Sequence, residues 1–236
     1  PLSRQEPENQ MSLSQPYYSG HGCLLFHGDC REILPQLPRN AVDLVITDPP
    51  YNAINRPSSG LRSFDKGTAD SLPVDIAALS LEFWRVVRGS LYVWCSDEQY
   101  TPWTMAFKKQ GATTRKCAWW KTNPPPTNGS RLWTSALELC VFARKPKAYH
   151  NAHCLPPVWK GPIARSFGGH PTTKPAWLME ILAKTSCPPG GTVLDPFVGS
   201  GTTLVACIKE ERIGIGIEIE ERYCEIAAQR IEALFK

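Results

Sequence analysis

The chain has 236 residues, of which 42% are hydrophobic and 20% are charged, a composition typical of one soluble globular domain with a large core. This excludes a collagenous, coiled-coil or disordered chain, and because no run of about 18 apolar residues occurs, we expect no membrane span. The polar residues 1–15 contain no apolar signal core, which favours the cytoplasm. The nine cysteines form no C-x-x-C pair, so we expect free thiols and no metal site.

The net charge of +4 is unevenly distributed along the chain. Residues 101–175 contain twelve Lys or Arg and a single acid, Glu138, which gives +11, whereas the remainder contains fourteen bases and twenty-one acids, which gives −7. Basic side chains bind phosphate, and interleaved aromatic rings stack on exposed bases. The segment therefore predicts nucleic-acid binding, with a solvated lysine-rich face as the alternative. It also holds five of the eight tryptophans, namely Trp103, Trp119, Trp120, Trp133 and Trp159.

The apolar pattern alternates between short runs typical of buried strands and longer amphipathic stretches typical of helices. After a loose leader over residues 1–20, it predicts in chain order a strand at 23–27, a short helix at 31–37, a strand at 42–47, a helix at 74–88, a strand at 91–95, a helix at 98–110, strands at 113–120 and 136–143, a helix at 176–185, a strand at 192–194, a helix at 200–209, a strand at 212–217 and a helix at 220–234. Such alternation indicates an α/β fold with a mostly parallel central sheet and helices on both faces.

Two segments lack this periodicity. Residues 52–72 are rich in Ser, Gly, Asn and Arg and are predicted to form a long loop, and loops of that length are usually functional. Residues 144–169 contain many Pro and Gly and are predicted to form a short irregular insert. We therefore expect residues 21–236 to form a single domain that carries a target-binding loop and a short recognition insert.

A glycine turn follows the predicted strand at 192–194. Its glycines let the backbone approach a ligand, because no Cβ intrudes, and the next helix begins with unpaired amides. Glu218 follows Asp195 by 23 residues, at the strand end where doubly wound folds bind a ribose. No Gly-Lys-Ser/Thr follows, so the pattern favours a nucleoside cofactor without a polyphosphate, the alternative being a tight turn with a capped helix. The predicted cofactor residues of this turn are Asp195, Phe197, Gly199, Ser200, Gly201 and Thr202.

A second turn, Asp48-Pro49-Pro50-Tyr51, follows the predicted buried strand at 42–47. Open α/β sheets bind ligands at this end of their strands. The two prolines make the backbone rigid, and Pro50 lacks an N–H donor. An exocyclic amino group has two N–H donors, which the Asp48 carboxylate and the Pro49 carbonyl can accept beside the flat ring of Tyr51. The turn therefore predicts a site for the amino group of a base, the alternative being a proline turn that only ends the strand.

Taken in this order, the two turns resemble those of the β-class S-adenosylmethionine-dependent DNA amino-methyltransferases. Three more segments are similar to that family: His27-Gly28-Asp29-Cys30, His170-Pro171-Thr172-Thr173-Lys174-Pro175, and Trp120-Lys121-Thr122-Asn123-Pro124 together with residues 138–142. The resemblance implies a Rossmann-like methyltransferase fold with permuted motif order and S-adenosylmethionine as cofactor. It implies that the first segment (Asp29, Cys30) contacts the cofactor, that the second (His170, Thr172, Lys174) closes over it, and that the third (Trp120, Lys121, Asn123) helps to hold a flipped base.

An Asp before Pro-Pro-Tyr implies, within this family, methylation of adenine N6 in DNA after base flipping. The alternatives are an N4-cytosine or RNA-adenine methyltransferase, or a catalytically silent nucleic-acid-binding module. The insert is shorter than the recognition domain of larger members, so a homodimer is expected to add contacts, and a paired restriction endonuclease is a further candidate partner in a prokaryotic or phage setting. Further expected DNA contacts are Tyr51, Arg56, Arg62, Lys145, Lys147, Lys160 and Arg165.

Overall fold

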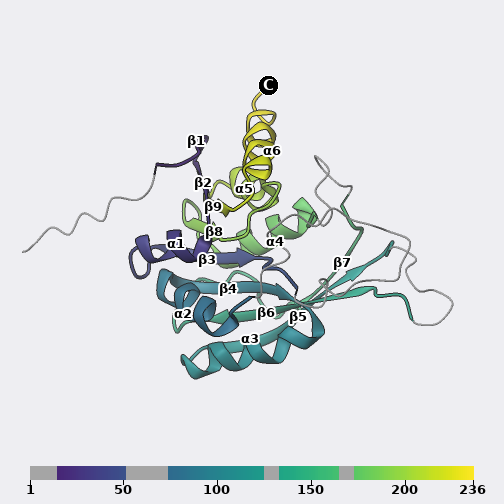
Figure 1. Ribbon diagram of the computed structural model, residues 1–236. Coiled ribbons are helices and arrows are strands. Elements are labelled where there is room, and N and C mark those ends of the chain that lie inside the picture. Colours follow the sequence, from purple (N-terminus) through teal and green to yellow (C-terminus); the bar gives the residue numbers. More distant parts are fainter. Residues whose placement is uncertain (1–14, 52–73, 125–132, 165–172) are drawn as a thin grey trace, which may run out of the picture.

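The computed structural model describes residues 15–51, 74–124, 133–164 and 173–236. Over these residues the chain forms a nine-stranded sheet in the order β1-β2-β9-β8-β3-β4-β6-β5-β7 (Figure 1). The strands are β1 (Tyr18–Gly20), β2 (Cys23–His27), β3 (Val42–Thr47), β4 (Val87–Cys95), β5 (Thr113–Lys121), β6 (Leu137–Arg144), β7 (Val158–Gly161), β8 (Thr192–Asp195) and β9 (Ile213–Glu218). The helices are α1 (Cys30–Ile33), the 3₁₀ helix η1 (Leu34–Gln36), α2 (Ile76–Val86), α3 (Asp97–Lys109), α4 (Ala176–Ser186), α5 (Thr202–Lys209) and α6 (Glu221–Glu232).

Five neighbouring strands, β2, β9, β8, β3 and β4, run parallel. The sheet continues with β6 antiparallel to β4 and β5 antiparallel to β6. From β3 the chain builds outward through β4 on one side, whereas β8 and β9 are added on the other. The crevice between β3 and β8 is thus the point where the strand order reverses, and open α/β sheets bind ligands there.

The central strand β3 is buried at all six positions because helices cover both faces of the sheet (Figure 1). Val45 packs in a core cluster with Trp103 of α3, whereas its neighbours Leu44 and Ile46 pack in another cluster with Leu178 of α4. Side chains that alternate between two apolar layers explain the almost continuous apolar run in the sequence. The expected α/β fold with a mostly parallel sheet is confirmed.

The first strand lies within the residues that we expected in a loose leader. Residues 18–20 pair antiparallel with β2, and the connecting His21 and Gly22 both have positive φ, 51° and 76°, as in a tight hairpin turn. The Tyr18 hydroxyl donates to Glu232 Oε1 of α6 over 2.6 Å, and the His21 ring stacks on Phe235 with centroids 3.7 Å apart. The start of the described chain is thus bound to its end.

Two further elements differ from the expectation. Strand β4 begins at Val87, directly after α2, because Gly89 permits close packing of β3 and β4: a Cβ there would lie 2.2 Å from the Asp43 carbonyl oxygen. The insert predicted as irregular contains β7, which pairs parallel with β5 and extends the sheet. All nine cysteines are free, and among the described residues no helix is both long and apolar enough to cross a membrane.

Candidate active site

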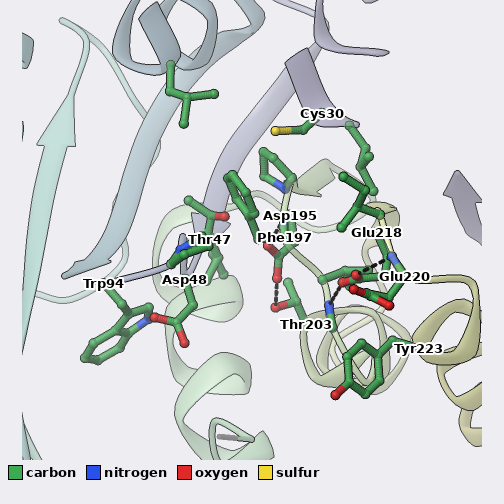
Figure 2. A pocket seen from close by; sticks show the side chains of 18 of the residues that line it. Cys30, Thr47, Asp48, Trp94, Asp195, Phe197, Thr203, Glu218, Glu220 and Tyr223 are labelled. Carbon is green, nitrogen blue, oxygen red and sulfur yellow. Dashed lines mark hydrogen bonds between the residues drawn. The ribbon is translucent and has the colours of Figure 1, made fainter. Parts of the chain in front are cut away.

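A pocket lies where the two predicted turns meet, at the carboxyl ends of β3 and β8 (Figure 2). The turns are far apart in sequence, and the neighbouring positions of β3 and β8 in the sheet bring them together. The predicted residues that line it are Asp29, Cys30, Asp48, Pro50, Lys174, Asp195, Phe197, Gly199, Ser200, Thr202 and Glu218. Pro49, Tyr51 and Gly201 are not among the lining residues, and His170 and Thr172 lie outside the described residues.

The glycine turn between β8 and α5 uses its two glycines differently. Gly199 has a φ of 51° and lines the pocket, as expected for a close approach to a ligand. Gly201, the N-cap of α5, has a φ of 82°, and a Cβ there would lie 2.8 Å from the Ala227 Cβ of α6. This glycine therefore allows α5 to pack closely on α6, and its expected contact with the cofactor stays a prediction.

The buried Asp195 carboxylate holds this turn in place. Its oxygens accept hydrogen bonds from the Thr203 hydroxyl over 2.6 Å and from the Phe197 N–H over 3.1 Å (Figure 2). Burial raises the pKa of Asp195 to about 7, although these donors favour the ionised form. A carboxyl group that titrates near neutral pH therefore lies in the wall of the pocket.

Glu218 lies at the end of β9 and connects it to the same turn. One carboxylate oxygen accepts the Gly199 N–H and the other accepts the Glu220 N–H, each over 2.9 Å. Burial raises the pKa of Glu218, and both N–H donors oppose that rise. Sequence reasoning missed Glu220 and Tyr223, which also line the pocket (Figure 2); their position at the start of a helix that follows a strand end was the available signal.

Asp29 combines the cofactor position implied by the resemblance with a capping role. It is the N-cap of α1, accepting the Arg31 N–H over 2.8 Å, and it also pairs with the Arg31 guanidinium, whose hydrogen bonds lower the pKa of Asp29. The same residue lines the pocket beside Cys30. Thr173, which lines the pocket from the segment before α4, has a buried hydroxyl that lacks a hydrogen-bond partner among the described residues. The wall thus presents carboxylates and an unpaired hydroxyl, which suit a ligand that carries ribose hydroxyls and positive charge.

Around Asp48 the structure forms a charged cluster. Its Oδ1 lies 2.8 Å from the Tyr51 hydroxyl, and its Oδ2 is bound to the Lys174 ammonium group. Lys174 also lies 2.5 Å from Glu138 Oε1, which is 3.0 Å from the Tyr51 hydroxyl. The other oxygen of Glu138 pairs with Lys121 over 2.6 Å. Two carboxylates and two ammonium groups therefore share one partly buried site.

The pKa values in this cluster move in opposite directions. Burial raises the pKa of Asp48, with Lys174 opposing and Glu138 reinforcing the rise. Burial also opposes ionisation of Glu138, but Lys174 and Lys121 outweigh it and lower the pKa of Glu138 to about 2. The two carboxylates raise the pKa of Lys174 against the effect of its burial. Glu138 and Lys174 are therefore charged at neutral pH, and Asp48 is the carboxyl of this cluster whose pKa is raised.

The turn that carries Asp48 is fixed by the start of α3. Ser96 and Gln99 form a capping box there, and the Gln99 side-chain amide donates to the Pro50 carbonyl oxygen over 3.1 Å. Pro50 has no N–H, so its carbonyl oxygen is the backbone group of that residue that can form a hydrogen bond, and Gln99 holds the turn through it. Gln99 is a positioning residue that sequence reasoning missed.

Glu138 belongs to the segment 138–142 that resembles the family, but sequence reasoning gave it no role of its own. Its signal was present, since it is the single acid among residues 101–175, and an acid alone among many bases is a candidate for a buried ion pair. Lys174, expected to close over the cofactor, contacts Asp48 and Glu138 as well as lining the pocket. The turn, β6 and the segment before α4 thus meet at one point.

The residues expected to bind DNA occupy different environments. Trp120 is half-exposed, with the Lys160 ammonium nitrogen 4.6 Å from the centroid of its ring. Lys121 is held by Glu138, and the side-chain oxygen of Asn123 accepts the Ile163 N–H over 2.8 Å. Arg56, Arg62 and Arg165 lie outside the described residues.

Lys145 and Lys147 lie near the amino ends of the parallel strands, whereas the site lies at their carboxyl ends. Because β6 is antiparallel to β4, it ends beside the first half of that strand, where Arg144 pairs with Ser90. The Lys145 ammonium group contacts the side chain of Asn40 over 2.9 Å and the Val87 carbonyl. Both lysines thus follow the amino ends of the parallel strands, away from Asp48. The direction of β6 thus places these lysines away from the site, and their expected contact with DNA stays a prediction.

The doubly wound sheet, the pocket at its reversal point and the acidic turn beside it define a Rossmann-like methyltransferase. A family profile described as DNA methylase matches residues 42–229, and the chain belongs to that family. It is a DNA methyltransferase that uses S-adenosylmethionine.

Relatives and solved structures agree with this assignment. The Type II methyltransferase M2.DpnII from Streptococcus pneumoniae is 31% identical over 94% of this chain and 94% of its own length, and M2.MboI from Moraxella bovis is 26% identical over 87% and 86%. The crystal structure of an M1.HpyAVI complex with S-adenosylmethionine is 29% identical, with a TM-score of 0.69 over 88% of this chain and 99% of that one. The cytosine-N4-specific PvuII methyltransferase, 19% identical with a TM-score of 0.72 over 92% of this chain, shares the fold.

Proposed function

We propose that this protein methylates the N6 amino group of adenine in double-stranded DNA after the base has been flipped out of the helix. The observation that carries the proposal is the Asp48 carboxylate, which lines the cofactor pocket on a turn whose backbone Gln99 holds. An amino group that reaches Asp48 is therefore beside the position of the cofactor. Because that amino group is paired and stacked inside a duplex, it reaches such a pocket only when the base leaves the stack.

The chain's task is to make a weak nucleophile reactive. The N6 lone pair of adenine is delocalised into the ring, and hydrogen bonds from N6–H to the Asp48 carboxylate and the Pro49 carbonyl draw the nitrogen toward tetrahedral geometry. Bound S-adenosylmethionine supplies an electrophilic methyl group on its sulfonium. The ionised Asp48 stabilises the positive charge that develops on N6, so catalysis rests on positioning and electrostatics.

Two partners complete the proposal. Trp120 and Lys160, adjacent on β5 and β7, offer an aromatic ring and a cation to DNA near the site. The relatives that carry Type II methyltransferase names support a role in restriction-modification with a paired endonuclease, in a prokaryotic or phage-derived system whose DNA lies in the cytoplasm. A second copy of the chain adds further DNA contacts.

The test is methyl transfer from radiolabelled S-adenosylmethionine to unmethylated duplex DNA, to single-stranded DNA and to RNA, followed by analysis of the product nucleosides. We expect N6-methyladenine from duplex DNA, and loss of about 10²-fold or more of the rate in Asp48→Ala, while cofactor affinity measured by calorimetry changes little. N4-methylcytosine or methylated RNA as the main product would replace the adenine assignment. Methylation-aware sequencing of DNA from cells expressing the chain then gives the target sequence.

A further inference from the structure

Glu138 occupies a position that the proposed chemistry does not yet use. Both donors that hold Asp48, the Tyr51 hydroxyl and the Lys174 ammonium group, also contact Glu138 through its Oε1, at 3.0 Å and 2.5 Å. Its Oε2 is taken by Lys121 over 2.6 Å. Lys121 thus fixes Glu138 from β5, while Oε1 shares two donors with Asp48.

The target amino group needs the carboxylate oxygens of Asp48, which these two donors occupy. Each oxygen of Asp48 already accepts from the protein, Oδ1 from Tyr51 and Oδ2 from Lys174. A lysine bound to Asp48 also cancels the negative charge that must stabilise N6 as it becomes positive. Yet Lys174 is only 10% exposed, and a buried ammonium group that loses its partner is strongly destabilised.

We propose that Glu138 is a positioning residue that retains Lys174 and the Tyr51 hydroxyl when the target amino group displaces them from Asp48. Neither donor has to travel, because each keeps its existing contact with Oε1 while its contact with Asp48 is broken. The exchange exposes the charge of Asp48 to the substrate without leaving a buried cation unpaired. The inference rests on the proposed function in one respect, namely that an amino group binds at Asp48.

The experiment compares single-turnover methylation by the parent protein, Glu138→Gln and Glu138→Asp on unmethylated duplex DNA at saturating cofactor. In Glu138→Gln, Lys174 remains on Asp48, and we expect the rate to fall about tenfold or more while the dissociation constant for S-adenosylmethionine changes less than about threefold. Glu138→Asp keeps the charge and should recover part of the rate. An unchanged rate in Glu138→Gln would overturn the inference.

A pH profile separates this role from a merely structural one. The titratable groups that face Asp48 are Lys174 before α4, Tyr51 on the turn, Glu138 and Cys140 on β6, Cys95 on β4 and Asp195 on β8. Since Glu138 raises the pKa of Asp48, its removal should move the acid limb of the rate profile to lower pH. The matched control is Asp43→Asn, which breaks another ion pair, with Arg88, at the amino end of β3 and should leave the acid limb where it is.

A double variant tests the link to Lys174. If Glu138 acts by retaining that ammonium group, Glu138→Gln should cost less than about threefold in a Lys174→Met background. A loss as large there as in the parent protein would overturn the inference. Thermal unfolding checks that each variant folds. If Glu138→Gln does not fold, Lys121→Met replaces it, because this variant frees Oε2 of Glu138 and should slow methyl transfer without altering cofactor affinity. The product nucleoside formed by the parent protein tests the proposed function, and the ratio of the variant's methylation rate to the parent's rate tests this inference.

Discussion

The Tyr51 hydroxyl lies against two carboxylates, so this side chain offers more than the flat face that the sequence predicts. The amino-binding turn and the glycine turn could both be recognised from sequence, because each is a short run of residues at a strand end. The Lys174–Glu138 contact could not, since it joins residues from distant segments that only the strand order brings together. Pairing between separate motifs is information that a local pattern does not contain.

Substitutions at Tyr51 should separate the ring from the hydroxyl. Tyr51→Phe keeps the face that stacks on the base but removes a donor to Asp48 and Glu138, and hydrogen bonds to charged groups contribute about 1.5–3 kcal/mol. Tyr51→Ala also loses stacking, about 1–3 kcal/mol per base. We expect single-turnover rates in the order parent, Phe, Ala. Equal rates for the parent and Tyr51→Phe would show that the hydroxyl contacts contribute nothing to transfer.

Asp195 should make cofactor binding pH-dependent. Its folded-state pKa is about 7, so the carboxyl becomes ionised as the pH rises through that value, and an ionised carboxylate favours a cationic sulfonium in the same pocket. Affinity for S-adenosylmethionine measured by calorimetry should therefore increase about tenfold between about pH 6 and pH 8. Asp195→Asn is the control, because titration of the cofactor's own amino group is common to both proteins. If affinity changes with pH equally in the parent and in Asp195→Asn, the sulfonium charge of the cofactor lies away from Asp195.

At the scale of elements, the long apolar runs gave reliable strands and helices, and the differences arise where contacts between elements decide. Gly89 looks like a strand breaker in sequence, yet the packing of β3 on β4 requires it. Residues 158–161 have no apolar alternation, and they form a strand because β5 offers an unpaired edge. Charge counting placed the basic residues of the middle segment on one surface, whereas the direction of β6 separates Lys145 and Lys147 from Lys160 of β7.

The two groups of lysines should behave differently toward salt. Lys160→Ala removes a cation beside Trp120, and the slope of log affinity for duplex DNA against log salt should flatten by up to about 0.9 if one phosphate contact is lost. The double variant Lys145→Ala/Lys147→Ala should leave that slope unchanged. It should instead lower the thermal stability, because Lys145 binds Asn40 and the Val87 carbonyl. A flatter slope in the double variant would mean that DNA reaches the amino ends of the parallel strands.

At the scale of the whole molecule, the insert adds a sheet strand, β7, where a larger enzyme has a recognition module. Sequence-specific interfaces bury at least about 600–1,000 Å² even for one small module. A short strand at the edge of the sheet contributes little of that area, so contacts must come from elsewhere. The fold class was predictable because alternation of strands and helices is a global property, whereas the use of the insert depends on which edge is free.

We therefore expect the protein to bind DNA as a dimer or to recognise a short site. Sedimentation with and without a duplex that contains the target sequence measures the first, and methylation-aware sequencing measures the second. A protein that stays monomeric and methylates one site of about six or more base pairs without a partner would contradict this prediction.

The hydrogen bond between Tyr18 and Glu232 and the stacking of His21 on Phe235 bring the first strand and the last helix of the described chain together. A short peptide link between these ends would close the backbone without disturbing the sheet, and a new break in the connection between β6 and β7 would then place the cofactor turn ahead of the amino-binding turn. Both turns would still meet at β3 and β8, because strand neighbours rather than reading order create the site. The order of the two motifs along such chains is thus free to change in evolution while the chemistry is kept.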